Sequence, residues 1–308
     1  MSIAVRKQHH PSHIRSSNAD RWARILAYII VGVFGLICLY PLLLTVMVSF
    51  TPDKTVVDEG YRLIPSKLSL STYIYLFDQN SGKIAKSYLV TIFITIVGTF
   101  GSMLVTCMIS YAISLREMKY RNVIAFICNF TSIFSAGLVP WYVICTKWYG
   151  LHNNILGLIL PMLFSVWNMF LMRTYFRAIS PSLYDAAKID GAGHLTIFFR
   201  IALPLSVTAL LTVGLMYALC YWNDWWHALM FIEDRNLFPL QYFLYKMMSN
   251  VNAINSGRVP SGAASGIPLP AENAKMAVTI ITIGPIIFLY PFIQRYFVKG
   301  IMMGAVKE

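Results

Sequence analysis

The sequence predicts an all-α integral membrane protein with six transmembrane helices and both termini in the cytoplasm. Of its 308 residues, 57% are hydrophobic and 12% are charged, and the mean hydropathy is +0.61. Soluble domains average about 45–50% apolar and about 25% charged residues, so this chain has too little polar surface to face water. Its apolar residues form long unbroken blocks, which favour helices over the alternating strands of a membrane barrel.

Six blocks are long enough to cross a membrane, which takes roughly 20 helical residues. Several contain Pro or Gly, which membrane helices tolerate where neighbouring groups satisfy the freed backbone. The chain is therefore expected to form one six-span domain, 25–298, between a tail at 1–24 and a tail at 299–308. The expected spans are 25–50, 86–115, 122–146, 154–175, 206–232 and 276–298.

The distribution of basic residues predicts the orientation. Six spans place both termini on one side, and cytoplasmic segments are enriched in Lys and Arg. With the termini inside, the inside segments hold 15 of the 25 basic residues and five of the 13 acidic ones. The net charge of +12 is then explained by topology, and no nucleic-acid partner is expected.

Two segments on the outside, 51–85 and 233–275, are expected to be long extracytoplasmic loops. Within the second, the run at 256–270 is rich in turn-forming residues and argues against a long helix there. Loops of this length in compact domains are usually functional or disordered. The short outside turn at 152–154 is expected to be solvated.

The inside segment 177–204, between spans four and five, carries an unusual pattern. Ser180 followed by Pro181 is typical of a helix start, and Gly191 suits the left-handed conformation that ends a helix. The pattern therefore predicts a short helix over 182–189 that projects from the membrane on the cytoplasmic side.

A second helical stretch is expected over 195–201, stopping at Leu203 and Pro204. The small residues of the elbow leave room for the backbone of another protein to approach closely. An amphipathic connector lying on the bilayer surface would show a similar pattern. The small residues are Ala186, Ala187, Gly191, Ala192 and Gly193.

From Asp185 to Pro204, the pattern D-A-A-K-I-D-G-A-x-x-x-x-x-F-x-x-I-x-L-P is similar to the EAA loop of ABC importer permeases. In that family the loop forms a coupling helix that sits in a cleft of a separate ATP-binding subunit. Here the leading acid is Asp rather than Glu, and Thr208 stands where a Pro is often found. The resemblance implies that the ATPase-coupling residues are Asp185, Ala186, Ala187, Asp190, Gly191, Ala192, Leu203 and Pro204.

Three further segments resemble carbohydrate-uptake permeases, and more narrowly their LplC-type subgroup. They are Y-W-N-D-W-W at 221–226, P-L-P-A-E-N at 268–273 and Q-R-Y-F-V-K-G at 294–300. Relatives in that subgroup import oligosaccharides such as those from pectin or alginate. The resemblance covers the chain from about residue 20 onward. It implies a type I importer in the bacterial plasma membrane, with a second related permease chain, two copies of an ATPase and an extracytoplasmic sugar-binding protein.

Nucleotide chemistry is not expected on this chain, because it contains no G-x-x-x-x-G-K-[ST] motif. ATP-Mg would be used by the partner ATPase. The five cysteines lie within apolar stretches without metal-ligand spacing, so neither a metal nor another cofactor is expected. The chain is predicted to be a transport subunit in contact with lipid and not an enzyme.

The fifth span combines a carboxylate with several aromatic residues. A carboxylate costs roughly 2.5–3.5 kcal/mol at the centre of a membrane helix, so it should face protein or water. Aromatic rings stack on the C–H faces of sugars, while polar groups bind sugar hydroxyls. Alternatively, the aromatics form a belt at the membrane interface. The candidate substrate-pathway residues are Tyr217, Tyr221, Trp222, Asn223 and Asp224.

Two other functions remain open for Asp224. A proton-coupled secondary carrier could use this carboxylate as its proton site. A membrane-embedded enzyme could pair it with His227, three residues later, as acid and base. The sequence contains no nucleophile or metal motif to accompany such a pair, and no internal repeat of the kind found in many carriers.

Overall fold

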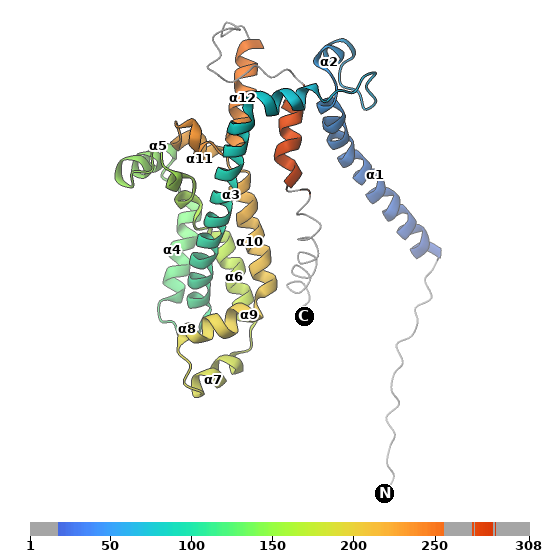
Figure 1. Ribbon diagram of the computed structural model, residues 1–308. Helices are drawn as coiled ribbons and strands as arrows, with labels where there is room; N and C mark the ends of the chain where they lie inside the picture. The colour runs from blue at the N-terminus through green and yellow to red at the C-terminus, as the bar shows by residue number, and fades with distance from the viewer. Residues whose placement is uncertain (1–17, 256–272, 274, 286, 288–308) are drawn as a thin grey trace.

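A computed structural model gives the fold of the chain (Figure 1). In the part that it describes, all regular structure is helical and no strand occurs, as predicted. Several predicted features lie wholly or partly outside that part, namely the tail 1–24, the loop 233–275 with its run 256–270, the span 276–298, the tail 299–308 and the motifs at 268–273 and 294–300. The described residues are 18–255, 273, 275–285 and 287.

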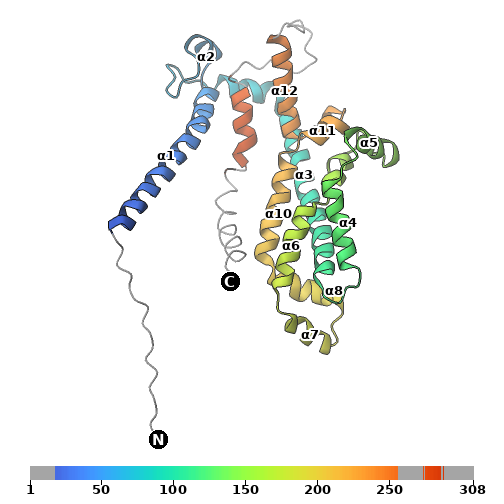
Figure 2. The same cartoon turned by 180° about the vertical axis from the view of Figure 1, so that it is seen from behind.

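The first helix, α1 (Asn18–Ser49), matches the first predicted span and stands apart from the other helices in both views (Figures 1 and 2). The apolar window of its segment Arg21–Ser49 buries nothing against the rest of the chain. Its last turns contact α3, where the hydroxyl of Ser49 is 2.9 Å from that of Tyr73. The apolar sides of α1 are therefore left for lipid or another protein to cover.

The second long helix, α3 (Ser71–Ser114), runs through the centre of the bundle. Its apolar part, Gly82–Ser114, matches the predicted second span. The expected outside loop 51–85 is wrong as a loop, because it contains the short helix α2 (Asp53–Glu59) and the first turns of α3. Residues 71–85 contain no proline, so helical hydrogen bonding can continue through them into the apolar part of α3.

The predicted third span is broken. The helix α4 (Arg121–Ile133) is followed by α5 (Leu138–Val143), which continues into the π-helical turn η1 (Ile144–Trp148). The two halves are bent by 113°. Pro140 lacks the backbone N–H that a helix continuing from α4 would need, so the chain turns before it.

The predicted fourth span is bent by 51°. It begins with two short 3-10 helices, η2 (Ile155–Leu158) and η3 (Leu160–Met162), and continues as α6 (Val166–Ala178). The hydroxyl of Ser165 accepts a hydrogen bond from the backbone N–H of Asn168 at 3.4 Å and so caps the new helix.

The predicted elbow is formed by α7 (Pro181–Ile189) and a second helical run at one end of the molecule (Figure 1). The predicted stop at Leu203 and Pro204 is wrong by about one residue, since the run continues to Leu205. It widens to a π-helical turn just before Pro204, which accommodates the missing N–H. The run comprises α8 (His194–Ile197), η4 (Phe198–Ala202) and α9 (Leu203–Leu205).

The predicted fifth span is also divided, into α10 (Val207–Trp222) and α11 (Trp226–Phe231). The carboxylate of Asp224 accepts a hydrogen bond from the backbone N–H of His227 at 3.3 Å, which favours a new helix start within the apolar block. The predicted continuous helix over 206–232 is therefore wrong.

The assignment of 233–275 as an extracytoplasmic loop stays a prediction, but its described part is not irregular. It contains the 3-10 helix η5 (Arg235–Leu237) and the 16-residue helix α12 (Leu240–Asn255). A further apolar helix, Lys275–Pro285, covers the described part of the sixth predicted span. By length and composition, the described residues hold two continuous candidate spans, and up to five if each bent pair crosses once.

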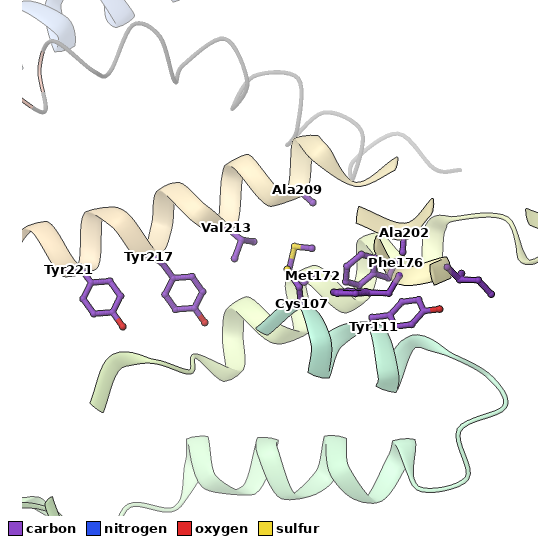
Figure 3. Packing of buried hydrophobic residues seen from close by; sticks show 11 residues of the cluster. Cys107, Tyr111, Met172, Phe176, Ala202, Ala209, Val213, Tyr217 and Tyr221 are labelled. Atoms are coloured by element: carbon purple, nitrogen blue, oxygen red, sulfur yellow. The ribbon is translucent and has the colours of Figure 1, made fainter. Parts of the chain in front are cut away.

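The core lies where α10 and α6 pack on α3 (Figure 3). Gly98 of α3 allows the closest approach, because a Cβ atom there would lie 2.5 Å from the ring of Tyr221 on α10. The core side chains are packed around Cys107, Tyr111, Met172, Phe176, Ala209 and Val213.

We predict that Gly98→Ala destabilises the protein by about 1–3 kcal/mol, because the buried ring of Tyr221 must shift to admit the methyl group. Gly214→Ala is the matched control: its Cβ would meet only Met103, at 3.8 Å, on the same α3–α10 interface. Thermal unfolding of the purified protein should show a lower midpoint for Gly98→Ala alone. Equal midpoints for the two variants would contradict this packing.

Candidate functional site

The elbow around α7 has the backbone conformation that the sequence predicts. Its helix begins one residue earlier than expected, at Pro181, and Gly191 follows it with φ +78°. The N–H of Ala192 donates to the carbonyl of Ala187 at 2.9 Å, which closes the helix end. Ser180 occupies the expected N-cap position, but its hydroxyl bonds to the hydroxyl of Ser182 and not to a backbone N–H.

The eight predicted coupling residues divide between two sides of the elbow. Ala187, Ala192 and Leu203 pack against the core of the bundle. The remaining five are exposed: Asp185, Ala186, Asp190, Gly191 and Pro204. Their assignment as coupling residues stays a prediction.

Exposed apolar side chains accompany these residues, which the sequence pattern did not single out. Ile189 is 86% exposed and Leu195 is 67% exposed, and Leu183 on α7 is also exposed. Exposed apolar side chains grouped around one short helix are typical of a surface that another protein covers. Alternation of apolar residues with the small ones along 183–195 is the signal that would have indicated this surface.

Lys188 and Tyr184 help to tie α7 to the bundle. Lys188 on α7 forms a salt bridge with Glu117, which follows α3. The ammonium group donates a hydrogen bond to the carboxylate and lowers the pKa of Glu117 below its usual range. Tyr184 packs edge-on against Tyr111 at 6.2 Å, and burial raises the pKa of Tyr184 to about 12, with a further contribution from Tyr111.

The Glu117–Lys188 contact should depend on pH. Because the pKa of Glu117 is lowered in the folded protein, its stabilising contribution is full above the usual Glu pKa of about 4.3 and is lost as the pH falls through the lowered value. A double-mutant cycle of Glu117→Gln and Lys188→Gln, followed by thermal unfolding, should show coupling at pH 7 that disappears in acid. Lys188→Arg is the control that keeps the charge. Coupling that does not weaken in acid, as long as the protein stays folded, would contradict the assignment.

At the other end of α10, the structure brings Asp224 and His227 together. Asp224 is 8% exposed, and its Oδ1 lies 2.9 Å from Nδ1 of His227. The other oxygen, Oδ2, is buried and has no hydrogen-bond partner among the described residues. The His227 ring lies against Trp141 and Phe231, with centroids 5.8 and 6.4 Å away.

Tyr217 and Tyr221 point from α10 into the core, side by side (Figure 3). The Tyr221 hydroxyl donates to the carbonyl of Ile159 and is 3.0 Å from the hydroxyl of Ser102. The Tyr217 hydroxyl accepts the N–H of Ser165 and is 2.6 Å from the Thr106 hydroxyl. Both side chains therefore join α3 to the segment that leads into α6.

The two remaining pathway candidates differ in exposure. Trp222 is half-buried, and its ring N–H has no partner among the described residues. Asn223 is exposed, donates to the carbonyl of Leu219 and accepts from Gln241 on α12. A role of the five candidates in substrate passage stays a prediction.

The turn at 152–154 is not merely solvated, which corrects the expectation. Asn153 has φ +52°, and its side-chain oxygen accepts the backbone N–H groups of Glu233 and Asp234 at 3.2 and 2.8 Å. Its own N–H donates to the carbonyl of Phe231. The sequence shows only an Asn in a polar turn. Its hydrogen-bond partners lie some 80 residues away, so no local pattern could predict them.

The described residues form an all-helical subunit with helices apolar and long enough to cross a membrane, which is typical of a transport permease. The family described as "Binding-protein-dependent transport system inner membrane component" matches residues 119–303, more than half of the chain. The chain belongs to this family. It is a permease subunit of an ABC importer, and a transport protein rather than an enzyme.

Two relatives match over nearly their whole length. The polygalacturonan/rhamnogalacturonan transport system permease protein YtcP of Bacillus subtilis (strain 168) is 36% identical, over 94% of this chain and 99% of that protein. Protein LplC of the same strain is 33% identical, over 97% of this chain and 98% of its own. These matches confirm the resemblance found in the sequence.

A solved structure has the same fold. One chain of a bacterial ABC transporter involved in the import of the acidic polysaccharide alginate matches with a TM-score of 0.79 and 30% identity. The match covers 92% of this chain and 99% of that one. Membership of this importer family implies a solute-binding protein, an ATPase and a partner permease.

Proposed function

We propose that this chain is one of two related permease chains of an ATP-driven oligosaccharide importer in the bacterial plasma membrane. It crosses the membrane six times, with both termini in the cytoplasm, and works with two copies of an ATPase. An extracytoplasmic binding protein delivers the sugar. The observation that carries this proposal is the exposed elbow of α7, which offers apolar and small residues to a partner.

The elbow is connected so that movement of α7 reaches the spans. Lys188 and Tyr184 hold α7 against the end of α3. The helical run His194–Leu205 then meets α10 at a bend of 85°. Closure of the ATPase pair would displace α7, and this run would transmit the displacement to α10. Because α10 packs tightly on α3, the bundle would rock as a unit and open the pathway alternately to each side.

The relatives support an oligosaccharide as the transported molecule. Their names give polygalacturonan or rhamnogalacturonan in one case, arabinooligosaccharides in the protein AraQ of Halalkalibacterium halodurans, and alginate in the solved structure. In this chain, Trp222, Asn223 and Asp224 lie together where α10 ends. Asn223 is the exposed member of the three and is the best candidate to bind a sugar hydroxyl.

Two further surfaces fit partners of such an importer. The apolar window of α1 buries nothing against the described residues, which suits contact with lipid and with a second permease chain. The segment that includes η5 and α12 lies at the opposite end from α7 (Figure 2), and we assign it to contact with the binding protein.

We expect Gly191→Val to abolish ATP-driven uptake. Its φ of +78° suits glycine, and no other atom lies within 4 Å of an added Cβ, so the change strains and enlarges the exposed elbow without filling the core. Gly193→Ala is the control, because it adds a methyl group on the same elbow at φ −74°. Uptake into membrane vesicles energised with ATP measures both. Normal uptake by Gly191→Val would count against docking at this elbow.

The second candidate, a proton-coupled carrier, is favoured by one observation: the buried Asp224–His227 pair with a free carboxylate oxygen. Asp224→Asn discriminates, since it removes the proton site and should abolish transport by a carrier. For an ATP-driven importer we expect uptake to be reduced but measurable. A protonophore, added with ATP held constant, should leave that uptake unchanged. Loss of uptake in both conditions would favour the carrier.

A further inference from the structure

A cavity of about 520 Å³ lies between α7 and the ends of α3, α4 and α6. Its lining includes four basic side chains and two acidic ones, which gives a surplus of two positive charges. Lys188 and Glu117 already satisfy each other. The surplus therefore resides in Arg116, Arg121 and Arg177, with Asp185 as the remaining acid.

The three arginines gather without a matching set of carboxylates. Among the ion pairs of residues 18–255, none involves Arg116, Arg121 or Arg177. A fourth guanidinium, that of Arg173 on α6, is partly buried near Arg177 and Arg121, and its Nε has no hydrogen-bond partner among the described residues. Arg116 and Arg177 are exposed and Arg121 is half-buried, and like charges that line one cavity favour the binding of an anion among them.

The outer surface of α4 continues from this cavity as an apolar face. Arg121 begins α4 at the cavity, and none of the residues of that helix is buried. Further along the helix, Phe126, Phe130 and Phe134 are exposed and stack on one another, with centroids 6.3 and 5.5 Å apart. A ligand with a negatively charged head and an apolar tail would fit the basic cavity and the adjoining apolar face of α4.

We infer that the cavity binds the phosphate group of an anionic phospholipid from the adjoining leaflet, with its acyl chains along α4. Basic pockets at the cytoplasmic ends of membrane helices attract such headgroups, and arginine pairs well with phosphate oxygens. This inference takes one point from the proposed function, namely that α7 lies on the cytoplasmic side of the membrane. Since Pro181, Tyr184 and Lys188 of α7 form one wall, the bound lipid contacts the helix that the ATPase moves.

The test uses the chain with the subunits that accompany it from its native membrane. The assembly is reconstituted in nanodiscs that contain equal amounts of phosphatidylglycerol and phosphatidylcholine, and native mass spectrometry counts the phospholipids retained. We expect one phosphatidylglycerol per copy of this chain. In Arg116→Gln/Arg177→Gln its affinity should fall about 30-fold, roughly fivefold for each charge removed.

Two matched variants separate this cavity from the general charge of the membrane surface. Lys119→Gln/Arg200→Gln removes two exposed charges outside the cavity and should retain the lipid as the wild type does. Arg116→Lys/Arg177→Lys keeps the charges and should retain most of the binding, which shows that the substituted site still folds.

Three results would overturn the inference. The glutamine variant could keep its phosphatidylglycerol, or the Lys119→Gln/Arg200→Gln control could lose it equally. Glycerol 1-phosphate could displace the lipid at equal concentration, which would assign the site to a soluble phosphate. Lipid retention is measured without transport, so its failure is distinct from failure of the Gly191→Val uptake test.

Discussion

The contact between α10 and α3 is the constraint on which the rest of the structure depends. Tyr217 and Tyr221 lie one turn apart on α10, and each hydroxyl bonds both to α3 and to the segment that leads into α6. In the membrane interior no water replaces such partners, so an unsatisfied hydroxyl or carbonyl costs several kcal/mol. The two tyrosines therefore fix three segments at once, and Gly98 allows the helices to approach closely enough for this.

These bonds also explain why the bent fourth span is tolerated. Ile159 lies where the short 3-10 helices interrupt the span, and Ser165 where α6 begins. The tyrosine hydroxyls bond to the N–H of Ser165 and to the carbonyl of Ile159, which also accepts the N–H of Met162. Irregular backbone is stable at this depth because it is buried in protein. The sequence indicated Tyr217 and Tyr221 as polar aromatics on one helix face, but only the fold shows that this face meets α3.

The sequence predicted the elements whose signals are local. The apolar run of α1, the main part of α3 and the short helix before Gly191 are all read from neighbouring residues. The breaks in the helices near Pro140 and Asp224 were not predicted, because the length of an apolar block does not indicate where the helix changes direction. α12 was missed because the turn-forming run after it dominated the composition of the whole segment.

The candidate site shows the same division. Helix signals and a resemblance located the elbow, and the i, i+3 spacing indicated the Asp224–His227 pair that the structure brings to 2.9 Å. The salt bridge of Lys188 with Glu117 and the role of Asn153 join residues about 70 and 80 positions apart. A single sequence does not indicate which residues so far apart in the chain come into contact.

The central claim is that α7 docks on an ATPase that this chain does not itself contain. Mass spectrometry of the proteins that co-purify with the chain from its native membrane in mild detergent tests this claim most directly. We predict recovery of an ATP-binding subunit together with a second, related permease chain. Recovery of the chain alone, folded and stable, would contradict the claim and would favour a carrier that uses the carboxylate of Asp224.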